Sequence, residues 1–170
     1  VKAAFKELTE LQFSPEQIVR IAGNAGGSKN IDGVKAAFSE LTALQFTPTQ
    51  IVQIVGNDGG CKNIEAVKTS FNALIELKFS SEQIVRIAGH GGGSKNIKAV
   101  TLAFRELSHL QFSPAQIVRI AGHGGGSKNI DAVKAAFTEL RALQFSPEQI
   151  VQIAGNAGGS KNIEVVKAAF

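Results

Sequence analysis

The chain has 170 residues, of which 44% are hydrophobic and 19% are charged, and its formal net charge is +4 at pH 7. This mild positive charge is compatible with a polyanionic partner without requiring one. The single cysteine, Cys61, excludes an internal disulfide, and no apolar run is long enough to span a bilayer.

A 33-residue segment recurs along the whole chain. Each copy opens on a phenylalanine, with no insertion or deletion between copies: Phe13, Phe46, Phe79, Phe112 and Phe145. A fixed period of this length is typical of stacked repeat arrays, in which each unit buries its apolar face against the next. We therefore predict one array over 1–170, a piece of a longer array that starts and ends within a repeat: a partial repeat at 1–12, repeats at 13–45, 46–78, 79–111 and 112–144, and a truncated repeat at 145–170.

Each unit begins with the start signals of an α-helix. In the first complete unit, Ser14 is a good N-cap, Pro15 suits the first helical position, and Gln17 completes a capping box. Apolar residues follow, and Gly23 is expected to end the helix in the usual C-terminal manner of glycine.

A second, longer helix is predicted after Gly26 and Gly27. Its apolar residues recur three, four and three positions apart, which is a helical spacing: Ile31, Val34, Phe38 and Leu41. The helix should end near Leu44, before the next unit starts. Because no segment shows strand alternation, the predicted fold class is all-α.

The loop between the two helices contains a variable pair of residues in a constant frame. A glycine precedes the pair, and Gly-Gly, a small residue and lysine follow it in every unit. The pair reads Asn-Ala, Asn-Asp, His-Gly, His-Gly and Asn-Ala in chain order. Drift of an exposed loop is the simplest alternative, but confinement of the variation to two positions argues against it.

The chemistry of the loop suits a nucleic acid. The constant lysine falls beside free backbone N–H groups at a helix start, which favour an anion, and one lysine per unit would follow a phosphate backbone. The Asp58 carboxylate could accept a hydrogen bond from the cytosine amino group, Gly91 and Gly124 leave room for a thymine methyl, and Ala25 and Ala157 should discriminate poorly. The Asn or His before each could cap carbonyls of the first helix.

These features resemble transcription activator-like effector (TALE) repeats, most of all the TALE-like repeats known from marine metagenomic sequences. The resemblance covers essentially the whole chain and rests on the Ser-Pro-Glu-Gln-Ile-Val opening, on Ile-Ala-Gly before the variable pair and on Gly-Gly after it. It implies a right-handed superhelical α-solenoid of 33-residue two-helix repeats. Such an array would bind double-stranded DNA in a sequence-specific manner, reading one base per repeat in the major groove, and would act in transcription regulation.

The resemblance also implies three roles for the loop residues. The second residue of each pair faces a base: Ala25, Asp58, Gly91, Gly124 and Ala157. The first braces the loop on a carbonyl of the helix before it, such as that of Arg20 or Gln53: Asn24, Asn57, His90, His123 and Asn156. The phosphate contacts follow each pair: Gly27, Ser28, Lys29, Gly60, Cys61, Lys62, Gly93, Ser94, Lys95, Gly126, Ser127, Lys128, Gly159, Ser160 and Lys161.

The units differ from those of plant pathogens, which are typically one residue longer, carry Lys-Gln after Gly-Gly and have a proline within the second helix. Here the small residue precedes the lysine and no proline interrupts the second helix. A shift of the phosphate-contacting atoms by one residue would follow.

Two other functions remain open from the sequence, a protein-binding helical solenoid and an RNA-reading helical repeat. The ankyrin Thr-Pro-Leu-His signature is missing, as are the tryptophan and tyrosine of tetratricopeptide repeats. RNA-reading repeats often stack bases on aromatic side chains, whereas Phe13, Phe38 and their equivalents are expected to pack internally. No His, Cys, Asp or Glu grouping has metal-ligand spacing. We therefore expect no enzyme activity, cofactor, metal, small-molecule substrate or membrane partner, and a monomeric protein.

Overall fold

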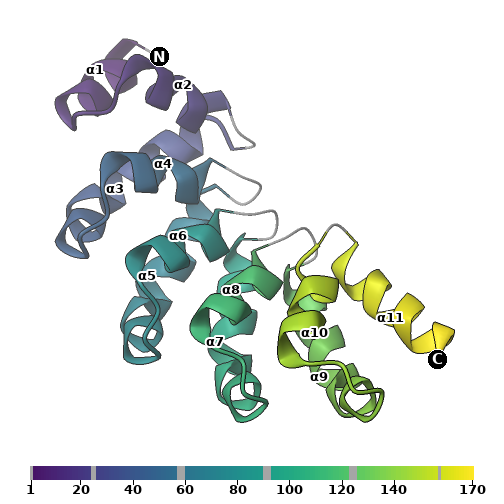
Figure 1. Ribbon diagram of the computed structural model, residues 1–170. Coiled ribbons are helices and arrows are strands. Elements are labelled where there is room, and N and C mark those ends of the chain that lie inside the picture. The colour runs from purple at the N-terminus through teal and green to yellow at the C-terminus, as the bar shows by residue number, and fades with distance from the viewer. Residues whose placement is uncertain (1, 24–25, 57–59, 90–92, 123–125, 157) are drawn as a thin grey trace.

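The computed structural model describes residues 2–23, 26–56, 60–89, 93–122, 126–156 and 158–170 (Figure 1). Over these residues the chain forms eleven α-helices and no β-strand, which confirms the all-α fold class. The helices are α1 (Lys2–Glu10), α2 (Pro15–Gly23), α3 (Ser28–Ala43), α4 (Pro48–Val55), α5 (Cys61–Glu76), α6 (Ser81–Ala88), α7 (Gly93–His109), α8 (Pro114–Ala121), α9 (Gly126–Ala142), α10 (Pro147–Ala154) and α11 (Gly159–Ala169).

The first helix of each unit begins as its sequence predicts. At α6, the Gln83 backbone N–H donates to Ser80 Oγ at 3.2 Å, and the Ser80 N–H donates to Gln83 Oε1 at 2.9 Å. The same reciprocal capping box opens α4, α8 and α10. Since α6 starts at Ser81, where the other units have proline, the cap alone is enough to set the helix start. Such an N-cap stabilises a helix by about 1 kcal/mol.

The second helix of each unit ends on a left-handed residue that is not glycine. Gln45, after α3, has φ of 66°, and its equivalents adopt the same backbone: Gln12, Lys78, Gln111 and Gln144. The Phe46 N–H donates to the Leu41 carbonyl at 3.0 Å, and the Gln45 N–H donates to the Thr42 carbonyl at 2.9 Å. These two bonds make a Schellman motif. Phe46 and Leu41 are both buried, so the motif turns the chain back into the core.

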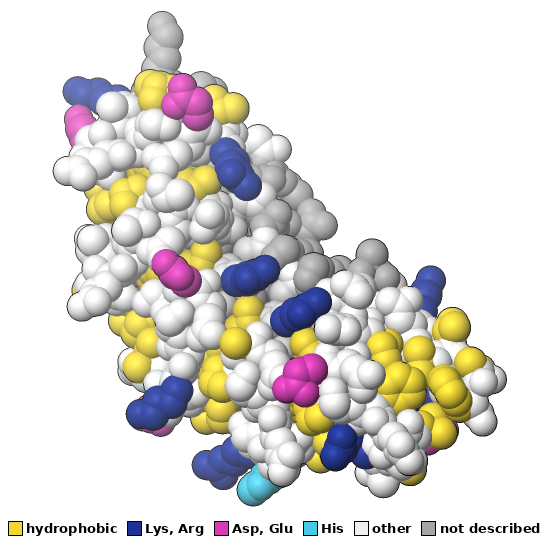
Figure 2. All heavy atoms as spheres, viewed as in Figure 1, with side chains coloured by type: hydrophobic (Ala, Val, Ile, Leu, Met, Phe, Trp, Pro, Cys, Tyr) yellow, Lys and Arg dark blue, Asp and Glu magenta, His cyan; other side chains and the backbone are white. Residues whose placement is uncertain are grey.

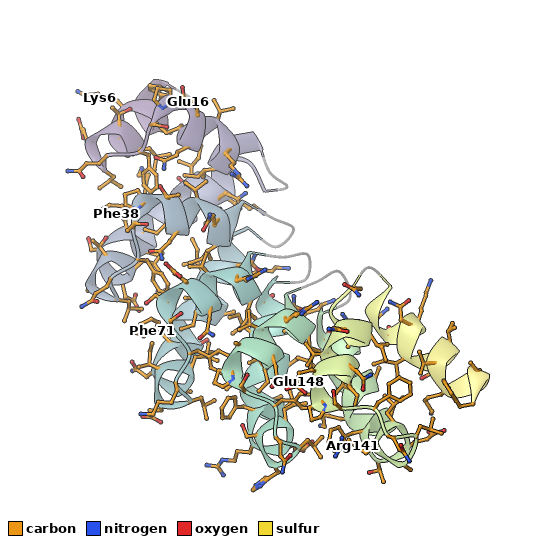
Figure 3. The ribbon with its side chains drawn as sticks, viewed as in Figure 1. Lys6, Glu16, Phe38, Phe71, Arg141 and Glu148 are labelled. Atoms are coloured by element: carbon orange, nitrogen blue, oxygen red, sulfur yellow. The ribbon has the colours of Figure 1, made fainter. Side chains whose placement is uncertain are left out.

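The phenylalanines pack inside the array, as expected. In each unit the opening phenylalanine lies edge-to-face against a phenylalanine of the second helix, with ring centroids 5.4–5.8 Å apart. This geometry favours the aromatic quadrupoles as well as burying area. Phe38 and Phe71, labelled in Figure 3, occupy equivalent places in successive units. The pairs are Phe13–Phe38, Phe46–Phe71, Phe79–Phe104, Phe112–Phe137 and Phe145–Phe170.

Successive helix pairs pack on one another, so the repeat of the sequence is also a repeat of the structure. First helices contact first helices in the order α2, α4, α6, α8 and α10, and second helices contact second helices from α3 to α11. The pairs follow one another along an arc in Figure 1. The ends of the first helices and the starts of the second helices lie on its inner side.

Ion pairs join neighbouring second helices on the surface. Lys68 Nζ lies 2.8 Å from Glu40 Oε2, and Lys167 Nζ lies 3.1 Å from Glu139 Oε2. Equivalent pairs are Lys35–Glu7 and Lys134–Glu106. The hydrogen bond to glutamate raises the pKa of Lys35, Lys68 and Lys167 above the ordinary lysine value. Any stabilisation from these pairs is therefore present below the ordinary lysine pKa and lost as pH rises through the higher folded pKa.

Between α5 and α7 both members of the ion pair are replaced. Ala73 stands at the glutamate position and Thr101 at the lysine position. The Thr101 hydroxyl donates instead to the Ile97 carbonyl of its own helix at 2.9 Å. The two substitutions occur together at a single boundary, so neither leaves an unpaired charge there.

The left-handed glutamine offers a direct test of the Schellman motif. We expect Gln111→Gly to raise the free energy of unfolding by about 0.5–1 kcal/mol. Glycine relieves about 1–2 kcal/mol of backbone strain, and part of this gain is offset because glycine loses more conformational entropy on folding. Ala135→Gly, at an exposed position within α9, is the matched control and should lower stability by about 1 kcal/mol. Urea unfolding measures both variants. Equal losses in the free energy of unfolding would contradict a strained left-handed backbone at Gln111.

Candidate nucleic-acid interface

The variable pairs lie almost entirely outside the described residues. This holds for the base-facing residues Ala25, Asp58, Gly91, Gly124 and Ala157, and for the bracing residues Asn24, Asn57, His90 and His123. The remaining bracing residue, Asn156, is described; it is exposed, and its backbone carbonyl accepts a hydrogen bond from the Gly159 N–H at 2.9 Å. The site is therefore built from the residues that flank each pair.

The flanking residues lie along the inner side of the arc (Figure 1). The constant lysines at the starts of the second helices are all exposed: Lys29, Lys62, Lys95, Lys128 and Lys161. Figure 2 shows Lys and Arg side chains spaced along the border of the residues that are not described. The fold thus brings the predicted phosphate-binding positions of the units to one side of the molecule, one unit after another.

A buried asparagine links each unit to the start of the next second helix. The Asn63 side chain, which is fully buried, donates from Nδ2 to the Ile54 carbonyl at 3.0 Å. Its Oδ1 accepts the Ser94 N–H, 31 residues later, at 2.9 Å. We call this arrangement the asparagine bridge. The same link to the next unit joins Asn30 to Cys61, Asn96 to Ser127 and Asn129 to Ser160, at 3.3, 3.1 and 2.9 Å.

In four of the five units, the second glycine of the Gly-Gly pair gives this asparagine room. A Cβ built on Gly60, Gly126 or Gly159 would lie 2.0–2.2 Å from the Oδ1 of the preceding asparagine, and one on Gly93 would lie 2.6 Å from it. These distances are far below van der Waals contact. Gly60, Gly93, Gly126 and Gly159, which were predicted to contact phosphate, are thus also required by packing between units.

The start of the second helix offers fewer backbone donors to an anion than the sequence suggested. We expected free N–H groups there, but the N–H groups of Cys61, Ser94, Ser127 and Ser160 are taken by the asparagine bridge. In the first and last of the five units the next N–H is also bonded: that of Lys29 donates to the Gly26 carbonyl at 2.9 Å, and that of Lys161 to the Gly158 carbonyl at 2.7 Å. The lysine ammonium groups and the neighbouring side chains at Ser28, Cys61, Ser94, Ser127 and Ser160 are the side-chain groups available to a phosphate here.

At Gly89 and Gly155, the glycine before the variable pair lies close to the preceding unit and does not have a left-handed backbone. The equivalents of Gly23 at the C-caps of α4, α6, α8 and α10 have φ between −69° and −86°. A Cβ on Gly89 would lie 3.1 Å from the Gln53 carbonyl, and one on Gly155 would lie 2.9 Å from Arg119 Cγ. In both cases the neighbour belongs to the first helix of the preceding unit. The expected glycine is therefore present at the end of the first helix, but the expectation that it adopts the left-handed conformation usual for a C-terminal glycine was wrong.

Sequence reasoning missed the asparagine bridge, although its signal was present. The tripeptide Lys-Asn-Ile recurs in all units, and a polar residue between a surface lysine and a core isoleucine had no assigned role: Asn30, Asn63, Asn96, Asn129 and Asn162. A buried amide must be hydrogen-bonded. The presence of the same asparagine in every unit could therefore have indicated a hydrogen-bonded link between units.

No protein-family model matches the chain, and no curated protein matches it. Within the described residues, no three His, Cys, Asp or Glu side chains are placed to hold a metal ion. In the same part of the chain, no helix is long and apolar enough to cross a membrane.

The close approach of glycine and asparagine generates a stability prediction. Gly126→Ala should lower the free energy of unfolding by about 1–3 kcal/mol, because the new methyl group meets the Asn96 side chain, which is held in place. The matched control is Gly23→Ala, where a Cβ meets no atom within 4 Å and stability should be unchanged or slightly raised. In urea unfolding, adding Asn96→Ala to Gly126→Ala should cost less than the sum of the two single changes; simple additivity would contradict the contact.

Proposed function

We propose that the chain is a TALE-like repeat array that binds double-stranded DNA and reads one base per repeat in the major groove. The observation that carries this proposal is that the five variable pairs stand in a constant frame whose described residues follow one side of the array. The variable pairs recur once per unit at a constant spacing. Such a surface suits a linear polymer whose variable chemical groups, one per monomer, also recur at a constant spacing. Double-stranded DNA is such a polymer.

The proposal includes a superhelical solenoid, for a geometric reason; its right hand is what the resemblance to TALE repeats implies. Neighbouring helices pack about 8–10 Å apart, whereas successive base pairs rise by about 3.4 Å along a strand. A straight stack would therefore lose register with the duplex after one or two units. An array that winds around the duplex follows a longer path per base pair and keeps one unit on each base.

Phosphate binding supplies affinity in this scheme, and the second loop residue supplies specificity. The exposed lysines would neutralise one phosphate per unit. Asp58 would accept from cytosine, Gly91 and Gly124 would admit the thymine methyl, and Ala25 and Ala157 would discriminate weakly. Read 5′ to 3′, the preferred site is a weakly specified base, C, T, T and a weakly specified base. A monomer suffices, and neither a cofactor nor a metal is needed.

Base reading by Asp58 is tested by binding-site selection from random duplexes. Asp58→Ala should abolish the cytosine preference at a single position, with a loss of about 1–3 kcal/mol of discrimination there. Asp32→Ala is the matched control, because it removes the same charge from an exposed position on α3. A weakening spread over all sites by Asp58→Ala would contradict the carboxylate–amino contact, and selection of no duplex would favour a protein-binding array.

Phosphate binding is tested by the salt dependence of affinity. With one phosphate neutralised per unit, log K should fall with log salt at a slope of about −4 to −5. Lys95→Ala should flatten this slope by about one and weaken all sequences alike. Lys78→Ala removes an equal charge at the other end of the unit, after α5, and should leave the slope unchanged. Equal effects of the two variants would contradict a contact at Lys95.

A further inference from the structure

We propose that each base-reading loop is held in position by the unit before it, so that the asparagines of the bridge act as positioning residues more for the next base than for their own. The residues concerned are Asn30, Asn63, Asn96 and Asn129. This inference rests on the proposed function and concerns the specificity of the same site.

The first support is the double anchoring of the asparagine amide. Asn63 donates to the Ile54 carbonyl near the end of α4 and accepts from Ser94 at the start of α7. The amide is planar, so its donor and its acceptor lie at a fixed angle to one another. It is fully buried, and turning it away would leave buried polar groups without partners. The amide therefore fixes the start of α7 relative to α4, which belongs to the preceding unit.

The second support comes from the other end of the loop. A Cβ on Gly89, the last residue before the variable pair, would lie 3.1 Å from the Gln53 carbonyl, again in the preceding unit. On the far side of the pair, the Gly93 backbone approaches Asn63 so closely that a Cβ would lie 2.6 Å from its Oδ1. Both stems of the loop that carries His90 and Gly91 thus rest on residues 46–78.

The consequence for reading is directional. Each loop is supported by its predecessor along the chain, and the N-terminal to C-terminal order of units corresponds to 5′ to 3′ along the strand in the proposed function. Removing a bridge asparagine should therefore disturb readout one base to the 3′ side of the unit that contains it. The Asp58 loop makes the clearest reporter, because it is the loop to which the proposed function assigns a hydrogen bond with a base.

The test compares two asparagines that flank this reporter. Asn30 precedes the Asp58 unit and bonds to its Cys61 N–H, whereas Asn63 lies within that unit. In selection from random duplexes, Asn30→Ala should reduce the cytosine preference from about tenfold towards parity, while Asn63→Ala should leave it within about twofold. If the asparagine served only its own loop, Asn63→Ala would abolish the preference and Asn30→Ala would spare it. That result, or an even loss of affinity with all preferences intact in both variants, would overturn the proposal.

Amide hydrogen exchange separates this proposal from the proposed function. Asn30→Ala should speed exchange of the Cys61 amide roughly tenfold and spare that of Ser94, and Asn63→Ala should do the reverse. Unchanged exchange in both variants would overturn the positioning role. If the chain without substitutions selects no sequence from random duplexes, the proposed function fails. The exchange rates then still show whether the bridge holds the start of the next second helix. Circular dichroism checks folding, and Asn63→Ser replaces Asn63→Ala should the latter unfold.

Discussion

The buried asparagine amide is the interaction on which the rest of the structure depends. An amide in an apolar interior is costly unless its donors and its acceptor are bonded. Asn63 meets that requirement with one bond inside its own unit and one bond to the next. Apolar packing between units is non-directional and tolerates sliding, whereas a planar amide does not. The bridge therefore gives a stack of interchangeable apolar surfaces one defined register.

The same contact changes what the constant loop residues mean. In four units the asparagine occupies the place that a Cβ on the second glycine would take, and at Gly89 and Gly155 the glycine before the pair lies close to the preceding first helix. Their constancy follows from packing, so it is not by itself evidence for a ligand. The lysines are different, because they are exposed and packing gives no reason to retain them in every unit. This contrast leaves the lysines and the variable pairs as the functional signal.

The sequence was informative wherever the determining contact is local. The capping box of Ser80 and Gln83 lies within four residues, and the helical apolar spacing appears within each unit, so helix starts and the fold class could be predicted. The asparagine bridge spans 31 residues, and nothing beside Asn63 in the sequence identifies the Ser94 N–H as the donor to its side chain. The left-handed Gln45 was also missed, because burial of Phe46 against Leu41 outweighs the ordinary preference for glycine there. For the candidate site, the sequence predicts the order of the residues along the array. It does not predict that the preceding unit holds them through the asparagine bridge.

The ion pairs between second helices limit how freely units could be exchanged during evolution or engineering. At most boundaries the lysine of one unit meets the glutamate of its predecessor, but Ala73 and Thr101 have replaced both at the α5–α7 boundary. Moving the unit that contains Thr101 behind one that contains Glu40 would strand a carboxylate without its cation. The compatibility of units in a recombined array would therefore depend on these helix surfaces. A cut within the second helix, between the lysine position and the glutamate position that follows it, would keep each matched couple intact.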